Sequence, residues 1–486
     1  MWRFPGWPPM GAAFGLGAVM AAGQAPLGFW WLTLAGFAAL CVLLVRADGW
    51  KPAAWTGLFA GAGHFALALN WIIEPFLVDP WTYGWMAPFA VILISFGMAL
   101  FWALAAGIAA RLPHGRRAIG FAVLLTVAEF ARGHVLTGFP WALPGHVWIG
   151  SAPAQLAAWV GPTGLTLLTL LLAALPVAWH WKGGIVSVIA LAAAFGAGWW
   201  RLDRPEPAAT GRIVRIVQPN AEQAMKWDPD RAAMLFQRSL DLTASPGRKD
   251  LVVWPETSVP YLLDNYVAEE IAFAAGVPAA VGIQRTEGER AFNSLAVIMP
   301  DATVGHIYDK HHLVPFGEYM PFGDTLAKVG ISAFAAQMGN GYSAGPGPEV
   351  LDLGPLGQAL PLICYEAVFP QDLVTPTRPD WILQITNDAW FGTLTGPYQH
   401  LAQARLRAIE QGLPMVRAAN TGVSAIIDGK GRVLAALPSG EAGYLDAALP
   451  SPLPPTLYSR AGEWPVLAVL ALLAALTAFL PCKRRG

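Results

Sequence analysis

The chain has 486 residues, of which 55% are hydrophobic and only 13% are charged, and its mean hydropathy is +0.45. This length excludes a single ordinary domain, and this hydropathy lies above the usual range of soluble proteins. The net charge of −1 gives no support for nucleic-acid binding, which requires a basic surface, so we expect no nucleic-acid partner. Charge is also unevenly distributed: residues 1–200 contain twelve Asp, Glu, Lys and Arg, and the rest of the chain contains the other 51. We therefore expect a lipid-compatible part and a water-compatible part.

Eight apolar segments are candidates for membrane-spanning helices, each of which needs roughly 20 apolar residues. They lie near residues 10–23, 28–45, 53–73, 86–110, 117–131, 154–178, 184–200 and 464–481. The first is short and rich in glycine, like the core of a signal peptide, but it runs almost directly into the second, so we interpret it as a span. We expect most of these helices to serve as anchor and scaffold.

The positive charges predict the orientation of the spans. On one side of the predicted membrane lie Arg3, Arg46, Lys51, Arg111, Arg116, Arg117, Lys182 and the terminal CKRRG. On the other side Arg132 is the main cation, beside Glu74 and Asp79. Seven spans followed by an eighth then place both termini in the cytoplasm. We expect residues 1–200 to form a membrane domain and residues 464–486 to form the last span and a basic tail. Residues 201–463 should face outward, which in a bacterium means the periplasm.

From Gly211 onward, short strands alternate with amphipathic helices. Strand-like runs include RIVRIVQPN, DLVVWPE and DWILQITND, and helix-like runs include DPDRAAMLFQRSLDLTA, YVAEEIAFAAG and YQHLAQARLRAIEQG. This alternation predicts a layered α/β domain whose strands are buried on both faces. In such domains reactive groups gather at the carboxyl ends of strands. Three residues stand at such ends: Glu256 in LVVWPE, Lys310 after GHIYD and Cys364 in ALPLIC.

The three cysteines lie far apart in the sequence. Cys41 and Cys482 are in apolar segments, and no CxxC pair is present, which argues against a disulfide framework and against a structural zinc site. Cys364 taken alone is more typical of a buried, inert thiol than of a nucleophile. Glu256 and Lys310 taken alone are likewise typical of solvated surface charges.

Together, an acid, a base and a thiol at three strand ends are what a cysteine acyl-transfer site requires. The thiolate is the nucleophile, yet a free cysteine is mostly protonated at neutral pH. Glu256 as general base can take the thiol proton and later deprotonate the acyl acceptor. Lys310 can favour the thiolate and, with a backbone N–H after the nucleophile, stabilise the oxyanion of a tetrahedral intermediate. This chemistry needs no metal and no cofactor, and we expect the adjacent His311 and His312 to be structural.

At these motifs the sequence resembles a known family. LVVWPET, YDKHHLVPFGEYMPF and LICYEAVFP, in this order, resemble the Glu-Lys-Cys motifs of the nitrilase superfamily. Joined to seven upstream spans and one downstream span, they resemble the bacterial apolipoprotein N-acyltransferases, membrane enzymes of lipoprotein maturation. The similarity covers essentially the whole chain, and QPNAEQAMKWDP and TNDAWFG add to its specificity. It implies a polytopic α-helical membrane domain joined to an extracytoplasmic nitrilase-like domain, an αββα sandwich.

The resemblance also implies roles for individual residues. It gives Glu256 as the base, Lys310 as the oxyanion stabiliser and Cys364 as the nucleophile. It further implies supporting residues around them: Glu318 near the base, Tyr365 and Glu366 beside the thiol, Asn293 in FNS, and Trp227 on a loop near the active-site entrance.

The implied reaction is a two-step acyl transfer in the bacterial inner membrane. Cys364 attacks an acyl ester of a phospholipid, which gives a thioester and a lysophospholipid. The free α-amino group of a diacylglyceryl-cysteine, the N-terminus of an apolipoprotein, then attacks the thioester. We expect a lipid-filled pocket under a mobile loop to keep water from the thioester, with residues 338–347 or 316–322 contributing that loop. We expect the protein to act as a monomer.

Two alternatives remain open. A membrane-anchored nitrilase-like amidase would hydrolyse a small amide and would need no phospholipid. A transporter or receptor would require ionisable residues inside the spans, and the clearest of these are His64 and Glu129. Glu129 lies one helical turn from Arg132, so we expect the two to pair. The transporter reading also leaves the order of the Glu-Lys-Cys motifs unexplained.

Overall fold

The structure of the protein is a computed structural model that describes residues 7–223, 226, 228–321 and 341–479. The chain forms two compact units. The first comprises residues 1–205, 409–411 and 455–486, and the second comprises residues 206–408 and 412–454.

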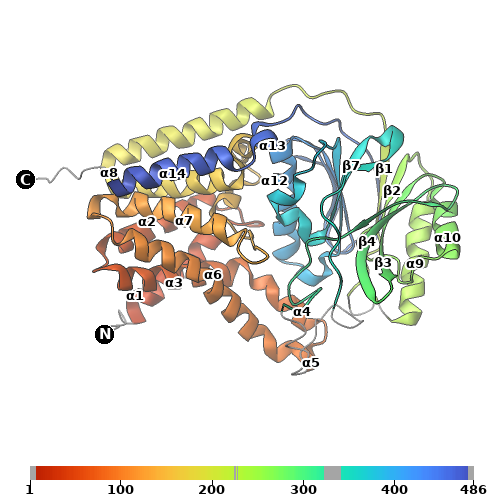
Figure 1. Ribbon diagram of the computed structural model, residues 1–486, viewed down its shortest axis with the longest axis horizontal. Coiled ribbons are helices and arrows are strands. Elements are labelled where there is room, and N and C mark those ends of the chain that lie inside the picture. Colours follow the sequence, from red (N-terminus) through yellow and green to blue (C-terminus); the bar gives the residue numbers. More distant parts are fainter. Residues whose placement is uncertain (1–6, 224–225, 227, 322–340, 480–486) are drawn as a thin grey trace, which may run out of the picture. The chain divides into compact units, whose positions relative to one another are not determined.

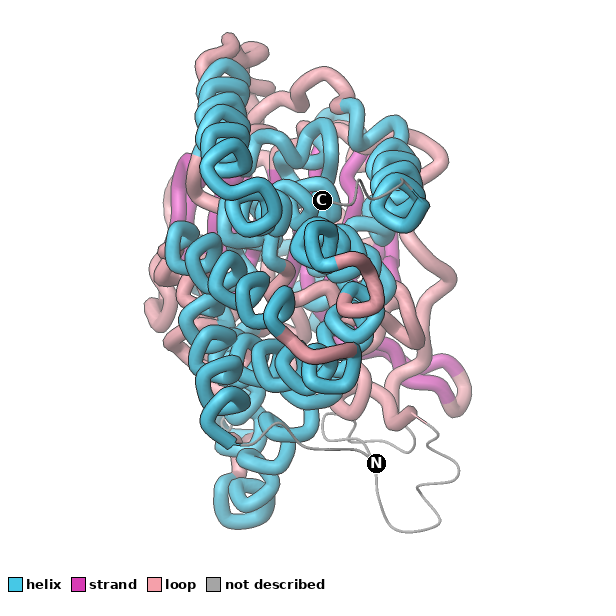
Figure 2. The backbone as a smooth tube through the Cα atoms, turned by 90° about the vertical axis from the view of Figure 1, so that its left-hand side faces the viewer, coloured by secondary structure: helices cyan, strands magenta, loops and turns pink. Residues whose placement is uncertain are grey.

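The described residues of the first unit form helices joined by turns and loops, with no strand among them (Figures 1 and 2). Its long helices are α1 (Trp7–Ala21), α2 (Trp30–Arg46), α3 (Trp50–Ala68), α6 (Ala87–Ala109), α7 (Arg117–Arg132), α8 (Ala157–Leu202) and α14 (Trp464–Phe479). Shorter helices are α4 (Glu74–Leu77), α5 (Pro80–Tyr83) and α13 (Leu457–Ala461). Every apolar segment picked out in the sequence therefore contains a helix.

α8 is a hairpin of two helices rather than one straight rod. Its backbone leaves the helical conformation at His180 (φ 51°, ψ −134°). The Ser187 hydroxyl donates a hydrogen bond to the Leu172 carbonyl at 2.9 Å, whereas fifteen residues of straight helix would separate the two by roughly 22 Å. The chain therefore reverses direction near His180, and the two arms correspond to the helices predicted at 154–178 and 184–200.

By length and composition, two of the described helical stretches are apolar and long enough to cross a membrane, Pro80–Ala109 and Ala152–Leu202. A third is added if the bent pair Trp50–Ala68 and Asn70–Leu77 is a single span. The helices α1, α2 and α14 are apolar but shorter. This criterion therefore supports a membrane domain, and it identifies fewer spans than the eight predicted.

The predicted pair of Glu129 and Arg132 is present at the end of α7. Both side chains are buried, and Arg132 Nε donates to Glu129 Oε2 at 3.0 Å. Trp102 Nε1 donates to the other carboxylate oxygen at 2.6 Å. Arg132 also donates to the carbonyls of Phe139 and Trp141. Because hydrogen bonds compensate its burial, the pair can fix the chain that follows α7.

The described residues of the second unit form two six-stranded sheets. The first sheet has the order β12 (Gly443–Ala448), β1 (Ile213–Gln218), β2 (Leu251–Val253), β3 (Ala279–Glu287), β4 (Arg290–Ile298) and β5 (Val304–Asp309). The second has the order β11 (Val433–Leu437), β10 (Ser424–Ile427), β9 (Met415–Ala419), β8 (Trp381–Thr386), β7 (Gln358–Ile363) and β6 (Leu351–Asp352). β1, β2 and β3 are parallel, as are β7, β8 and β9, whereas β1 and β12 are antiparallel.

The two sheets face each other, and helices cover the outer face of each (Figure 1). Between the sheets, the Ser424 hydroxyl of β10 donates to the Gln218 side-chain oxygen of β1 at 2.6 Å. The helices α9 (Pro229–Ala244) and α10 (Asn265–Ala275) pack on the first sheet, and α12 (Gly396–Gln411) packs on the second. The central strands are rich in Val, Ile, Leu and Ala because both of their faces are buried. The predicted αββα sandwich is confirmed.

Candidate active site

The three predicted chemical residues follow strands of the second unit. Lys310 comes directly after β5 and Cys364 directly after β7, as expected from the sequence. Glu256 lies three residues beyond β2, because Pro255 lacks the N–H that would continue the strand. The turn that carries Glu256 passes close over β3. A Cβ at Gly282 would lie 2.6 Å from the Cα of Glu256, so only glycine leaves room for this turn.

Lys310 and Asn293 join two buried carboxylates into one cluster. Lys310 Nζ lies 2.9 Å from Glu318 Oε1 and 3.4 Å from Glu256 Oε1. Asn293 on β4 donates from Nδ2 to the same two oxygens, at 2.9 Å and 2.7 Å respectively. All four side chains are buried. The structure therefore brings these four sequence-predicted residues together, and the lysine and the amide offset the repulsion between the two carboxylates.

The second oxygen of each carboxylate is also fixed. The backbone N–H of Asn387, directly after β8, donates to Glu256 Oε2 at 2.8 Å. The backbone N–H of Val314 donates to Glu318 Oε2 at 2.9 Å. Each carboxylate is thus held in one orientation, which a positioned general base requires.

Both members of the Glu256–Lys310 pair act electrostatically on the thiol of Cys364. Burial and Glu256 raise the pKa of Cys364 above the usual range of a thiol, while Lys310 and a hydrogen bond with Thr386 lower it. The raising effects dominate, so the resting thiol is protonated. A base is therefore needed to form the thiolate.

Lys310 remains a cation in this setting. Burial disfavours its charged form, but Glu318 and Glu256 outweigh burial and raise the pKa of Lys310 above its usual range. A lysine that keeps its charge at neutral pH is a fixed hydrogen-bond donor for developing negative charge.

Glu366 accepts hydrogen bonds from several donors on two segments. Its Oε2 accepts from the Ile363 N–H at 2.7 Å and from the Tyr308 hydroxyl at 3.0 Å, and its Oε1 accepts from the His311 N–H at 2.8 Å. The side chain is completely buried. Glu366 therefore joins the turn that contains Cys364 to the segment that contains Lys310.

Tyr365 packs its ring edge-on against Phe369, with 4.8 Å between the ring centroids, and its centroid lies 5.6 Å from that of His312. The structure thus places Tyr365 in an aromatic cluster next to the nucleophile in the chain. Direct support of the thiol by Tyr365 and Glu366 stays a prediction.

The two histidines after Lys310 face carboxylates. His311 Nδ1 lies 2.7 Å from Glu366 Oε1, and His312 Nδ1 lies 2.8 Å from Asp372 Oδ2. Burial disfavours the charged form of His311, but hydrogen bonds with Asp372 and Glu366 raise the pKa of His311 to about 10. Within the described residues, no group of His, Cys, Asp and Glu is arranged to hold a metal ion.

Trp227 lies outside the described residues, but its neighbour Lys226 is described and was not identified from the sequence. The buried Nζ of Lys226 donates to the Glu256 carbonyl at 3.1 Å and to the Thr257 hydroxyl. Burial lowers the pKa of Lys226 to about 8, against the opposing effect of Glu256 and Cys364. The Lys226 side chain therefore contacts the turn that carries the base. The motif QPNAEQAMKWDP contains this lysine, and its position beside Trp227 was the signal that could have identified it.

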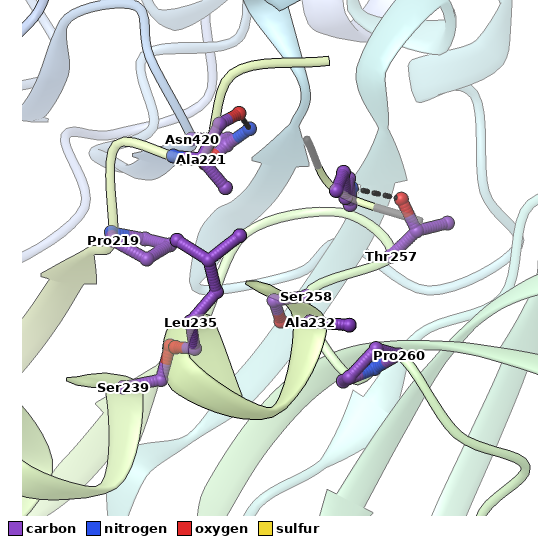
Figure 3. A pocket seen from close by; sticks show the side chains of 10 residues that line it. Pro219, Ala221, Ala232, Leu235, Ser239, Thr257, Ser258, Pro260 and Asn420 are labelled. Atoms are coloured by element: carbon purple, nitrogen blue, oxygen red, sulfur yellow. Dashed lines mark hydrogen bonds between the residues drawn. The ribbon is translucent and has the colours of Figure 1, made fainter. Parts of the chain in front are cut away.

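A pocket lies beside the turn that carries Glu256 (Figure 3). It is lined by Pro219, Ala221, Lys226, Ala232, Leu235, Ser239, Thr257, Ser258, Pro260 and Asn420. Figure 3 shows that side chains of α9 meet the 257–260 turn there. The described lining contains none of Glu256, Lys310 and Cys364, so this pocket lies beside the turn that carries Glu256 and does not contain the three predicted chemical residues.

The expected loop at 338–347 is described from residue 341 onward, and this part is attached to the cluster. Residues 338–340, and residue 322 of the candidate loop at 316–322, lie outside the described residues. The Tyr342 N–H donates to the Glu318 carbonyl at 2.8 Å, and the Gly345 N–H donates to the Lys310 carbonyl at 2.9 Å. Burial, Glu318 and Glu256 raise the pKa of Tyr342, so its hydroxyl stays protonated beside the carboxylates. Tyr342 was missed because an isolated tyrosine in a glycine-rich segment carries no chemical signal. A lid function of this loop stays a prediction.

Known proteins resemble both units of this chain. A family model described as the apolipoprotein N-acyltransferase N-terminal domain matches residues 16–175, and one described as carbon-nitrogen hydrolase matches residues 213–453. The apolipoprotein N-acyltransferase of Caulobacter vibrioides is 40% identical, over 98% of this chain and 96% of that protein. This chain belongs to the apolipoprotein N-acyltransferase family. The apolipoprotein N-acyltransferases of Bradyrhizobium diazoefficiens and Brucella melitensis are each 37% identical, over 99% of this chain and 96% and 97% of their own lengths.

The two matched regions of this apolipoprotein N-acyltransferase family member fall in different units. Residues 16–175 lie in the helical first unit, and residues 213–453 lie almost entirely in the sandwich. The residues after β2, β5 and β7 therefore belong to the carbon-nitrogen hydrolase region. The resemblance to the nitrilase superfamily and to the N-acyltransferases is confirmed.

Proposed function

We propose that this protein transfers a fatty acyl chain from a membrane phospholipid to the α-amino group of the N-terminal diacylglyceryl-cysteine of apolipoproteins. The observation that carries the proposal is the buried contact of Lys310 Nζ with Glu256 Oε1 at 3.4 Å, in the same domain in which the buried Cys364 directly follows a central strand. Membership of the apolipoprotein N-acyltransferase family supports the choice of substrates.

The first step acylates the enzyme. Glu256 takes the proton of the Cys364 thiol, and Sγ attacks the carbonyl carbon of the acyl ester. Lys310 and the backbone N–H of Tyr365 stabilise the oxyanion of the tetrahedral intermediate. The S–C bond forms, the ester C–O bond breaks, and Glu256 returns the proton to the leaving oxygen. The products are a thioester on Cys364 and a lysophospholipid.

The second step transfers the acyl chain. The α-amino nitrogen of the diacylglyceryl-cysteine attacks the thioester carbon, and Glu256 takes a proton from that nitrogen. The N–C bond forms, the C–S bond breaks, and the proton passes to the Cys364 sulfur. The enzyme returns to its starting state, and the lipoprotein carries an amide-linked third acyl chain.

The membrane arrangement is part of the proposal. Eight spans in the inner membrane place both termini in the cytoplasm and residues 201–463 in the periplasm, and the enzyme acts as a monomer. The apolar helices of the first unit support this arrangement, as does the hairpin of α8, which supplies two antiparallel passes. The bias of Lys and Arg in the loops supports the orientation.

Incubation with phospholipid alone tests the mechanism. Purified protein is mixed with phospholipid vesicles, and the peptide that contains Cys364 is analysed by mass spectrometry for an acyl adduct that hydroxylamine removes. We expect an adduct in the wild type and in Cys41→Ala, which removes the other described cysteine, and none in Cys364→Ala. Absence from the wild type, or persistence in Cys364→Ala, contradicts the proposal.

Adding a diacylglyceryl-cysteine peptide to the acylated enzyme tests the acceptor. We expect the adduct to disappear while an N-acylated peptide accumulates. Release of free fatty acid with no N-acylated peptide would instead favour a hydrolase.

A further inference from the structure

The peptide group that follows the nucleophile is held from one side by two buried donors. His400 Nε2, on α12, lies 3.1 Å from the carbonyl oxygen of Cys364, and Gln384 Nε2, on β8, lies 3.4 Å from the same oxygen. Both donor side chains are completely buried. Cys364 needs such support because its φ of 52° lies in the left-handed region, which is strained for a residue with a Cβ. Strained conformations of this kind persist only where surrounding contacts enforce them.

His400 is itself fixed on its other ring nitrogen. Nδ1 lies 2.9 Å from Asp388 Oδ1, and the Asp388 Oδ2 accepts from Arg417 at 2.6 Å. Although burial opposes ionisation, Arg417 and His400 hold the pKa of Asp388 at about 2. The ring edge of Phe391 also packs against the imidazole, with 5.3 Å between centroids. The imidazole therefore has one defined orientation. Both oxygens that face it only accept, so both contacts are hydrogen bonds in the doubly protonated ring. Burial and Arg417 lower the pKa of His400, whereas Asp388 and the Cys364 carbonyl oppose them and favour that cation.

The two donors belong to a single connected network. Arg417, on β9, donates from Nη1 to Gln384 Oε1 at 2.7 Å while its Nη2 holds Asp388. Gln384 and Arg417 are paired residues of the parallel strands β8 and β9. Gly422 lets the loop after β9 approach Asp388, since a Cβ there would lie 2.1 Å from Oδ2. A buried network in which the members hold one another is rigid.

Fixing the Cys364 carbonyl also fixes the next N–H. The peptide bond between Cys364 and Tyr365 is planar and trans, so its C=O and N–H point in opposite directions. When His400 and Gln384 bind the oxygen, the N–H of Tyr365 must point away from them. In the proposed reaction that N–H is a donor to the oxyanion, and the value of such a donor depends on its direction.

We propose that His400 is a positioning residue: through its hydrogen bond to the Cys364 carbonyl, it orients the Tyr365 N–H for the oxyanion. The inference rests on the proposed role of Cys364 as nucleophile. A purely structural role for the same network predicts different consequences, because loss of folding would affect every property of the thiol.

Three substitutions of His400 test the contact of Nε2 with the Cys364 carbonyl separately from the contact of Nδ1 with Asp388. The amide nitrogen of His400→Gln reaches about as far as Nε2 and can donate to the Cys364 carbonyl. The shorter His400→Asn places its amide near Nδ1, where it can bind Asp388 but not the carbonyl. His400→Leu removes both contacts. The Gln and Asn variants therefore form a matched pair that differs in the hydrogen bond to the Cys364 carbonyl.

Two rates are measured for each variant. Formation of the Cys364 thioester from phospholipid passes through an oxyanion, whereas alkylation of the thiol by iodoacetamide does not. For Asn and Leu we expect thioester formation to slow by about 10- to 100-fold, less than the loss that follows complete removal of an oxyanion donor. We expect His400→Gln to stay close to the wild-type rate of thioester formation, and all folded variants to keep the wild-type alkylation rate and the KM for phospholipid. His400→Leu leaves Asp388 without its imidazole partner, so we expect a lower thermal unfolding midpoint for this variant.

Equal rates of thioester formation in the Gln and Asn variants would overturn the inference, as would a parallel loss of alkylation and acylation. If His400→Leu does not fold, the Gln and Asn pair still decides the question. A wild-type protein that forms no thioester refutes the proposed function itself, whereas a wild type that acylates alongside three unimpaired variants refutes only the role of His400.

Discussion

The backbone N–H of Asn387 donates to Glu256 Oε2 at 2.8 Å, although 131 residues separate them in the chain. Asn387 follows β8 in one sheet and Glu256 follows β2 in the other, so this bond connects the two halves of the sandwich. The Asn387 side chain continues the connection to Gln223 at 2.7 Å and Asn420 at 2.8 Å. The position of the base therefore depends on complete assembly of the second unit, and several predictions about the cluster can be tested directly.

Replacing the base should separate acylation from thiol reactivity. In Glu256→Gln we expect thioester formation to fall by about 10²- to 10⁴-fold, because the leaving oxygen loses its proton donor. Glu256 raises the pKa of Cys364, so its loss should lower that pKa and speed alkylation by iodoacetamide at pH 8. Both rates are measured on the same preparation. Parallel loss of the two rates would indicate a misfolded site instead.

The two buried lysines should differ in their effects. Lys310 acts on the thiol, so we expect Lys310→Gln to reduce thioester formation by about 10²- to 10³-fold, as for other lost oxyanion donors. Lys226 holds the Glu256 carbonyl, so we expect Lys226→Gln to be slower than wild type but faster than Lys310→Gln. Thermal unfolding in detergent serves as the folding control. Equal losses would show that Lys310 has no special role.

The Asn293 amide should matter as a donor between two acceptors. In the isosteric Asn293→Asp, a third carboxylate faces Glu256 and Glu318, and like charges at this distance repel. We expect thioester formation to fall by about 100-fold or more, with a smaller loss in Asn293→Ala, which removes the donor without adding charge. The comparison is made by single-turnover acylation. An Asp variant as active as the Ala variant would contradict this reading.

His311 should make stability depend on alkaline pH. Its pKa is raised to about 10 in the folded protein, from about 6.5 in an unfolded chain. Its interactions with Asp372 and Glu366 should therefore contribute fully below pH 6.5 and be lost as pH rises through about 10. We expect the unfolding midpoint to decline over this window in the wild type and to decline less in His311→Gln. His306→Gln serves as the control, because the His306 ring on β5 contacts the Asp352 carbonyl, a backbone group.

Glu366 should affect stability more than chemistry. A glutamine in its place offers one acceptor oxygen and one NH₂ group, which would face the backbone donors that now bind the carboxylate. We expect Glu366→Gln to lower the free energy of unfolding by about 2–4 kcal/mol, since buried donors to a charged group are left without a partner. Denaturant unfolding measures this loss. An unchanged free energy with abolished acylation would instead assign Glu366 to the chemistry.

The sequence predicted the central residues because their positions follow from topology. Cys364 and Lys310 stand directly after buried strands, and the carboxyl ends of such strands meet at one edge. Glu318 was found only through its motif, because nothing in PFGEYMPF alone indicates that its carboxylate lies 2.9 Å from Lys310 Nζ. The alternation of strands and helices was enough to predict the layers.

Other contacts depend on pairings that no short stretch contains. Asn293 reaches the carboxylates from within β4, and the expectation that reactive groups follow strands does not cover it. The network around His400 joins β8, β9 and α12. The sequence does indicate this network, through Gln384 and Arg417. These two polar residues lie inside the otherwise apolar runs WILQIT and MVRAA. A fully buried polar residue needs partners, so such residues mark networks even when the partners are unknown.

The pairing of β1 with β12 has a consequence for the history of the chain. Near these strands the Leu449 N–H donates to the Arg212 carbonyl at 2.9 Å, and the Thr210 hydroxyl donates to the Leu449 carbonyl at 2.7 Å. The polypeptide therefore enters and leaves the sandwich at neighbouring points. A domain with adjacent ends can be acquired within a loop of another protein without disturbing either fold. This architecture fits the insertion of a complete hydrolase-like domain between two helices of a helical membrane protein.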